Sequence, residues 1–89
     1  MKTTRLETIK QIRILAHMIK ENLMTDNLGD LLFAQNEMEK LIIQFHEVFP
    51  DLMNAGEFRT AKDDYDAFLN LVDAAYAEEI EKSGKRTKA

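Results

Sequence analysis

Residues 4–49 read TRLETIKQIRILAHMIKENLMTDNLGDLLFAQNEMEKLIIQFHEVF and consist of two amphipathic segments joined by a short polar break. In the first segment the apolar residues recur every three or four positions, which is the spacing of one face of an α-helix. Thr4 and Glu7 have the spacing at which a side chain and the backbone cap each other at a helix start. The segment therefore predicts an amphipathic helix over residues 4–24, with an apolar stripe made of Leu6, Ile9, Ile12, Leu15, Ala16, Ile19 and Leu23.

The polar break consists of Thr25, Asp26 and Asn27, three residue types that commonly cap helix starts. A second helix is therefore predicted over residues 28–49, where Pro50 ends it because proline cannot continue a helix. Its apolar stripe is predicted to contain Leu28, Leu31, Ala34, Met38, Leu41, Ile42, Phe45, Val48 and Phe49.

A third helix is predicted over residues 57–82, after a single helical turn or compact loop at residues 50–56. Its stripe contains Phe58, Ala61, Tyr65, Phe68, Val72, Ala75 and Tyr76. Short connections force successive helices to run antiparallel. The predicted fold class is therefore all-α, an antiparallel three-helix bundle that forms a single domain over residues 1–82, with a basic, flexible C-terminal tail at residues 83–89. Two copies could pair as a homodimer, since so short a chain buries a small share of its surface.

The composition narrows the class of protein. The 89 residues are 45% hydrophobic and 31% charged, with one Pro and no Cys, so disorder, disulfide bonds and thiolate metal sites are excluded. Charged residues interrupt residues 1–10 before any apolar run develops, and no run approaches the roughly 20 apolar residues that span a membrane. We expect a cytoplasmic location without membrane contact.

Few side chains are available for chemistry. The chain has two His, one Ser and three scattered Gly, which provide neither a catalytic constellation nor a phosphate-binding loop. His17 has Glu21 four residues on, but one such pair does not make a metal ligand set, and a surface contact between the two is the expectation. The sequence predicts that the protein is not an enzyme and has no cofactor, metal or small-molecule substrate.

The residues His17, Met18, Ile19 and Lys20 resemble the start of the His-x-x-Lys-Gly signature of histidine phosphotransfer domains, which are also helical bundles. The resemblance covers these four residues and implies that His17 would accept a phosphoryl group. Glu21 stands where that family has Gly, and its negative charge beside the acceptor argues against phosphoryl transfer.

The charge distribution suggests an alternative function linked to nucleic acid. Residues 1–20 and 82–89 each carry a net charge of +4 (5 − 1 and 4 − 0), whereas residues 21–81 carry 3 − 15 = −12. The basic ends could bind DNA or RNA weakly, but the acidic body would repel a duplex, so direct binding is not expected. The acidic body could also act as a DNA mimic that occupies a DNA-binding protein.

The apolar residues outside the three stripes give the leading hypothesis. A set of six is predicted to form a second face for partner binding: Ile14, Met18, Leu32, Phe33, Ile43 and Leu71. The leading interpretation is a small, non-enzymatic helical protein that acts by protein–protein interaction as a regulator, inhibitor or accessory factor. Its partner would be another protein or a second copy of itself.

Overall fold

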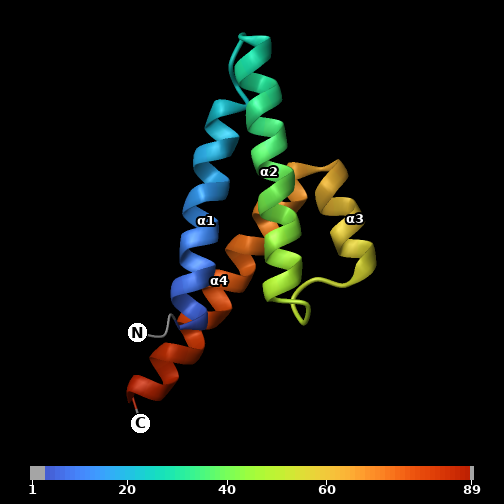
Figure 1. Ribbon diagram of the computed structural model, residues 1–89. Coiled ribbons are helices and arrows are strands. Elements are labelled where there is room, and N and C mark those ends of the chain that lie inside the picture. Colours follow the sequence, from blue (N-terminus) through green and yellow to red (C-terminus); the bar gives the residue numbers. More distant parts are fainter. Residues whose placement is uncertain (1–3, 89) are drawn as a thin grey trace.

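The computed structural model describes residues 4–88, with the surroundings of the side chains given for residues 4–82. The described chain is all-helical, as predicted, and contains four helices instead of three: α1 Arg5–Asn22, α2 Leu28–Val48, α3 Ala55–Asp63 and α4 Tyr65–Lys88 (Figure 1).

The first two helices begin at the residues that the sequence indicates. The Thr4 hydroxyl accepts a hydrogen bond from the backbone N–H of Glu7 at 3.1 Å, and the Asn27 side chain accepts one from the N–H of Asp30 at 3.0 Å. Each of these side chains satisfies a donor that the helix start leaves without an intrahelical partner. The second helix ends at Val48, just before Pro50.

The prediction of one continuous helix over residues 57–82 is wrong. Asp64 has extended backbone geometry, and its carboxylate accepts from the N–H groups of Asp66 and Ala67 at 3.0 and 3.4 Å. Asp64 therefore caps the start of α4. An aspartate side chain that hydrogen-bonds nearby backbone N–H groups favours a break in the helix over its continuation. The third helix also starts earlier than predicted, because Asn54 and Glu57 form a reciprocal capping box that starts α3 at Ala55, within the predicted loop.

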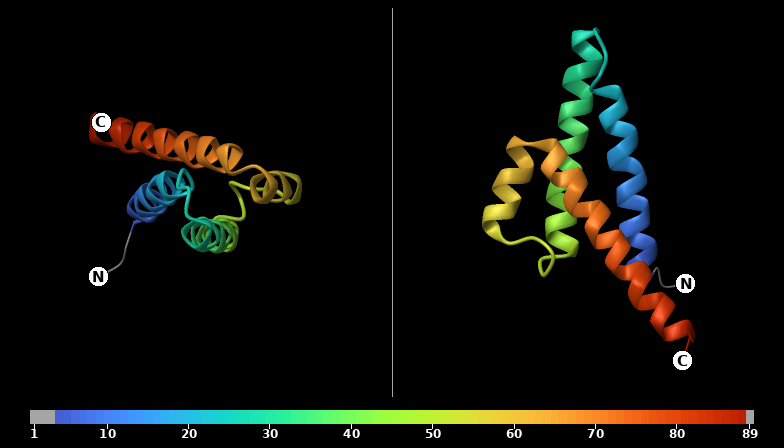
Figure 2. Two further views of the ribbon diagram at one scale, coloured as in Figure 1. Left: turned by 90° about the horizontal axis from the view of Figure 1, so that it is seen from above. Right: turned by 180° about the vertical axis from the view of Figure 1, so that it is seen from behind.

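The helices α1 and α2 form an antiparallel hairpin, and α4 crosses one side of it obliquely (Figures 1 and 2). Three ion pairs fix the register between α1 and α4: Arg5 with Glu79, Arg13 with Asp73, and Lys20 with Asp66. The residue numbers rise along α1 while they fall along α4, so these two helices are antiparallel. The short α3 packs beside α2 and α4, and the His46 and Phe58 rings lie 4.5 Å apart.

One hydrophobic core joins all four helices and the loop after α2. Its centre is Phe45, whose ring lies 5.3 Å from the Phe49 ring and 5.7 Å from the Phe68 ring. Met53, in the loop, is also buried. The buried cluster comprises Ile9, Ile12, Ala16, Met38, Leu41, Ile42, Phe45, Phe49, Met53, Ala61, Phe68, Leu69, Val72 and Ala75.

The C-terminal part of α4 includes most of the segment predicted as a tail. The helix continues to Lys88, and residue 89 lies outside the described residues. The flexibility of residues 83–89 stays a prediction.

Candidate functional site

The helical hairpin formed by α1 and α2 extends past the start of α4. The first turn of α4 contacts Lys20 through Asp66 and Glu39 through Tyr65, whose hydroxyl donates to the Glu39 carboxylate at 3.0 Å. Residues 21–38, called here the hairpin tip, lie beyond these contacts, and Figure 1 shows neither α3 nor α4 beside them. Among the described residues, the tip therefore consists of the end of α1, the start of α2 and their connection, and the two helices pack on each other through one face each.

Four large apolar side chains remain exposed at the hairpin tip. They are Met24 at 77% exposed, Leu28 at 68%, Leu32 at 56% and Phe33 at 67%. Leu28 and Leu32 are four residues apart, so they are neighbours on one face of the first turns of α2. Phe33 projects about 100° away from Leu32, where it lines a hollow together with Met24.

Met24 and Phe33 line one hollow, of about 450 Å³, at the connection between α1 and α2. A second hollow, of about 280 Å³, lies on the outer face of α1 and is lined by Ile14 and Met18. Glu21 lines both hollows, so the two adjoin. The linings of both hollows are mixed, because polar side chains such as Arg13, His17, Asn22 and Thr25 stand between the apolar ones.

The charges at the hairpin tip are all negative. Residues 21–38 contain Glu21, Asp26, Asp30 and Glu37 and no Lys, Arg or His, which gives 0 − 4 = −4. Glu37 lies 3.6 Å from Lys40, whereas no ion pair within the described part of the chain involves the other three. Glu21 and Asp30 both line the hollow that holds Met24 and Phe33. Unpaired carboxylates therefore border the exposed apolar side chains.

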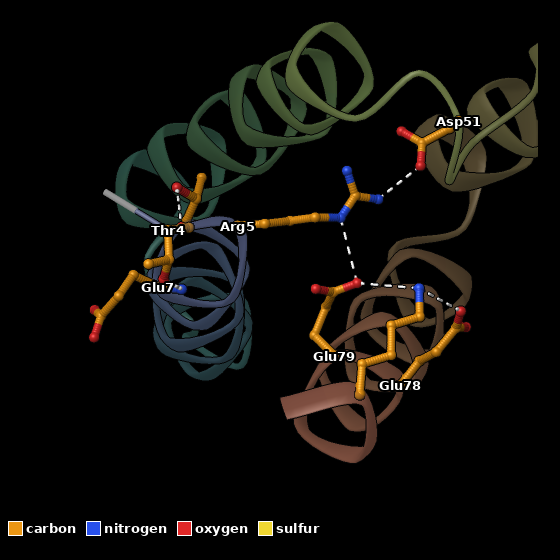
Figure 3. A network of polar contacts seen from close by, with 8 residues as sticks. Thr4, Arg5, Glu7, Asp51, Glu78 and Glu79 are labelled. Atoms are coloured by element: carbon orange, nitrogen blue, oxygen red, sulfur yellow. Dashed lines mark hydrogen bonds and ion pairs between the residues drawn. The ribbon is translucent and has the colours of Figure 1, made fainter. Parts of the chain in front are cut away.

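The opposite end of the molecule differs, because its charges neutralise each other (Figure 3). The Arg5 guanidinium donates to Asp51 at 2.6 Å and to Glu79 at 3.3 Å, and it lies 4.9 Å from the centre of the Phe49 ring. The hydrogen bond from Arg5 lowers the pKa of the Asp51 carboxyl. Lys82 pairs with Glu78 and Glu79. Charges that bind one another here are not available to a partner.

His17 contacts α4 instead of Glu21. Its Nε2 lies 2.9 Å from the same Asp73 oxygen that accepts from Arg13 at 2.9 Å. Burial raises the pKa of Asp73, but the hydrogen bonds and charges of His17 and Arg13 outweigh burial, so the pKa lies below its usual value. The carboxylate beside Nε2 also places negative charge where a phosphoryl group would approach.

The six predicted partner-binding residues do not form one face. Ile14, Met18, Leu32, Phe33 and Ile43 are exposed, as the prediction requires, and all except Ile43 lie at or next to the hairpin tip. Leu71 is partly buried against the core and lines a separate groove of about 640 Å³ between α3 and α4. Whether any of the six contacts a partner stays a prediction.

Two exposed tip residues, Met24 and Leu28, are not among the six predicted partner-binding residues. Leu28 falls on the predicted core stripe of α2, and Met24 directly follows the last turn of α1. Because Leu28 falls on that stripe, its sequence position alone predicts that it is buried. The missing signal is that α4 starts beside the middle of α2 and does not cover these residues, which a helical pattern does not encode.

Within the described residues, no group of three or more His, Cys, Asp or Glu side chains is placed to hold a metal ion. Among the same residues, every helix is too short or too polar to cross a lipid bilayer. Comparison of the chain with protein-family models, with curated proteins and with solved structures found no match.

Proposed function

We propose that the chain is a non-enzymatic protein-interaction module, whose docking surface is the hairpin tip. The observation that carries this proposal is the exposure of Met24, Leu28, Leu32 and Phe33 at the one end of the hairpin that α4 does not cover, where Met24 and Phe33 line one hollow. Single exposed apolar residues are ordinary, but contiguous apolar surface is typical of interaction sites. Exposed Met and Phe side chains also suit a docking surface, because they offer adaptable and large contact areas.

A photo-crosslinking amino acid at Asn36 tests this function. Asn36 is exposed and lies three and four residues after Phe33 and Leu32, so a docked partner would pass within its reach. Cells that make the protein should give a discrete crosslinked species from position 36 and none from the exposed Ala77 on α4. Phe33→Asp, checked for folding by circular dichroism, should abolish the species. A species that survives Phe33→Asp, or that forms equally from position 77, would refute the tip as the docking surface.

The alternative function, linked to nucleic acid, stays a prediction that no contact in the structure favours. Arg5, Arg13 and Lys20, three of the cations on α1, are each paired with a carboxylate. Phosphate would have to displace these partners before binding. Retention on DNA that weakens with salt would support direct binding, and capture of a DNA-binding protein that DNA competes away would support mimicry. Pairing of two copies also stays a prediction.

A further inference from the structure

The charge of the hairpin tip indicates the chemistry of its partner. We propose that the tip binds a cationic amphipathic helix of another protein, a segment with apolar residues on one face and Lys or Arg on the other. This inference rests on the proposed function, since it names the class of partner for the same surface. An amphipathic helix docks by laying its apolar face against apolar side chains, here Met24 and Phe33, which are exposed and line one hollow.

Charge complementarity selects the cationic partner. Glu21 and Asp30 line the hollow that holds Met24 and Phe33, and Asp26 lies in the connection between α1 and α2. No cation of residues 21–38 offsets these three charges. A partner with Lys or Arg beside its apolar face would bring opposite charges together at the rim of the interface, which steers association and suppresses wrong partners. An acidic or neutral helix would leave these carboxylates without partners.

The same charges argue against a second copy of this chain as the occupant. A symmetric pair of tips would bring the carboxylates of both copies together, because a two-fold contact uses one surface twice. The chain's own basic C-terminal segment cannot reach the tip, since α4 starts beside the middle of α2 and runs away from the tip (Figures 1 and 2). The molecule extends about 51 Å along its longest axis.

A synthetic peptide of about 18 residues, with Leu on one helical face and Lys on the other, is a suitable probe, since it spans about 27 Å as a helix. Two peptides serve as controls: the same composition in a scrambled order, and the amphipathic peptide with Glu in place of Lys. Fluorescence anisotropy should show binding of the amphipathic Lys peptide, at least tenfold weaker binding of the scrambled peptide, and none of the Glu peptide. Equal binding of a control peptide, or no binding of the Lys peptide, would overturn the inference.

Matched protein variants distinguish the effect of the tip charges on peptide binding from the effect of the protein's overall charge. Glu21→Gln, Asp26→Asn and Asp30→Asn together should weaken binding of the Lys peptide about tenfold at low salt and reduce its salt dependence. Glu7→Gln, Glu47→Gln and Asp63→Asn remove the same charge from exposed positions elsewhere and should change the affinity less than twofold. Equal losses in both triple variants would show a general attraction to an acidic protein and refute a specific site.

Phe33→Ala should weaken binding of the Lys peptide at least tenfold, because large aromatic residues at the centre of interfaces dominate their affinity. Light scattering on the free protein tests the other occupant: self-association that Phe33→Ala abolishes would assign the tip to a second copy. The crosslinking experiment distinguishes the two levels of the proposal. If a species formed at position 36 depends on Phe33 but contains an acidic or neutral segment, the docking function stands and the cationic partner falls.

Discussion

Phe33 and Phe45 lie on the same helix, and truncating each to alanine compares the hairpin tip with the core. Phe45 is fully buried, and Phe→Ala in a core costs about 3–5 kcal/mol through lost burial and a residual cavity. Phe33 is 67% exposed, so about a third of the roughly 1.5–3 kcal/mol for complete burial is at stake, or about 0.5–1 kcal/mol. The better helix propensity of alanine offsets part of this loss. We expect Phe33→Ala to lower the free energy of unfolding by less than about 1 kcal/mol.

Urea denaturation followed by circular dichroism, at several protein concentrations, measures both variants. A chain of this length has a free energy of unfolding of roughly 4–13 kcal/mol, so Phe45→Ala could leave it largely unfolded. The neighbouring pair Ile42→Val and Ile43→Val gives a milder comparison, because Ile42 is buried and Ile43 is exposed. Equal destabilisation by Phe33→Ala and Phe45→Ala, or a midpoint that rises with protein concentration, would refute the reasoning. Phe33 would then be buried against another surface, such as a second copy.

Two further predictions concern α4, namely the cap at its start and the contact of Asp73 with α1. Asp64→Ala removes the cap of α4 and should lower the free energy of unfolding by about 1 kcal/mol. Asp64→Asn should lower it less, because the Asn side chain can still accept a hydrogen bond from the backbone N–H groups at the helix start. If Asp64→Ala were more stable than the wild type, α3 and α4 would have merged into one helix. The pKa of Asp73 is lowered in the folded state, so its stabilisation is present above the unfolded pKa of about 3.9 and is lost as the pH falls through the folded pKa. Denaturation midpoints of Asp73→Asn should therefore fall less steeply than those of the wild type below about pH 4, and identical slopes would contradict this.

The sequence predicts helix starts better than helix continuity. Thr4 and Asn27 cap where their residue types indicate, because a cap is a local hydrogen bond between a side chain and the nearby backbone. The break at Asp64 was missed, since the apolar residues on both sides keep the spacing of one stripe through it. A single capping residue can redirect the chain without disturbing that spacing.

The candidate site could be predicted only in part, for a different reason. The helical pattern of α1 and α2 identifies which face of each helix is apolar, and it correctly places Ile14, Met18 and Phe33 on the outer faces. The pattern does not indicate how much of the hairpin α4 covers. Leu28 lies on a core stripe but is exposed, because the contacts of Lys20 and Glu39 with α4 mark the end of the shared core.

The composition of the hairpin tip is better explained by a partner than by the fold. A hairpin needs only its inner faces to be apolar, and at the tip Ala34 and Met38 are buried on the inner face of α2. The outer positions contribute little to folding and could be polar at small cost in stability, since exposed substitutions usually change it by less than about 0.5 kcal/mol. They are instead Leu28, Leu32 and Phe33, and Glu21 and Asp30 line the same hollow as Phe33. Among the described residues, neither carboxylate forms an ion pair. Exposed apolar side chains beside carboxylates of one sign would be complementary to a partner of opposite charge, which is the arrangement that the proposed docking requires.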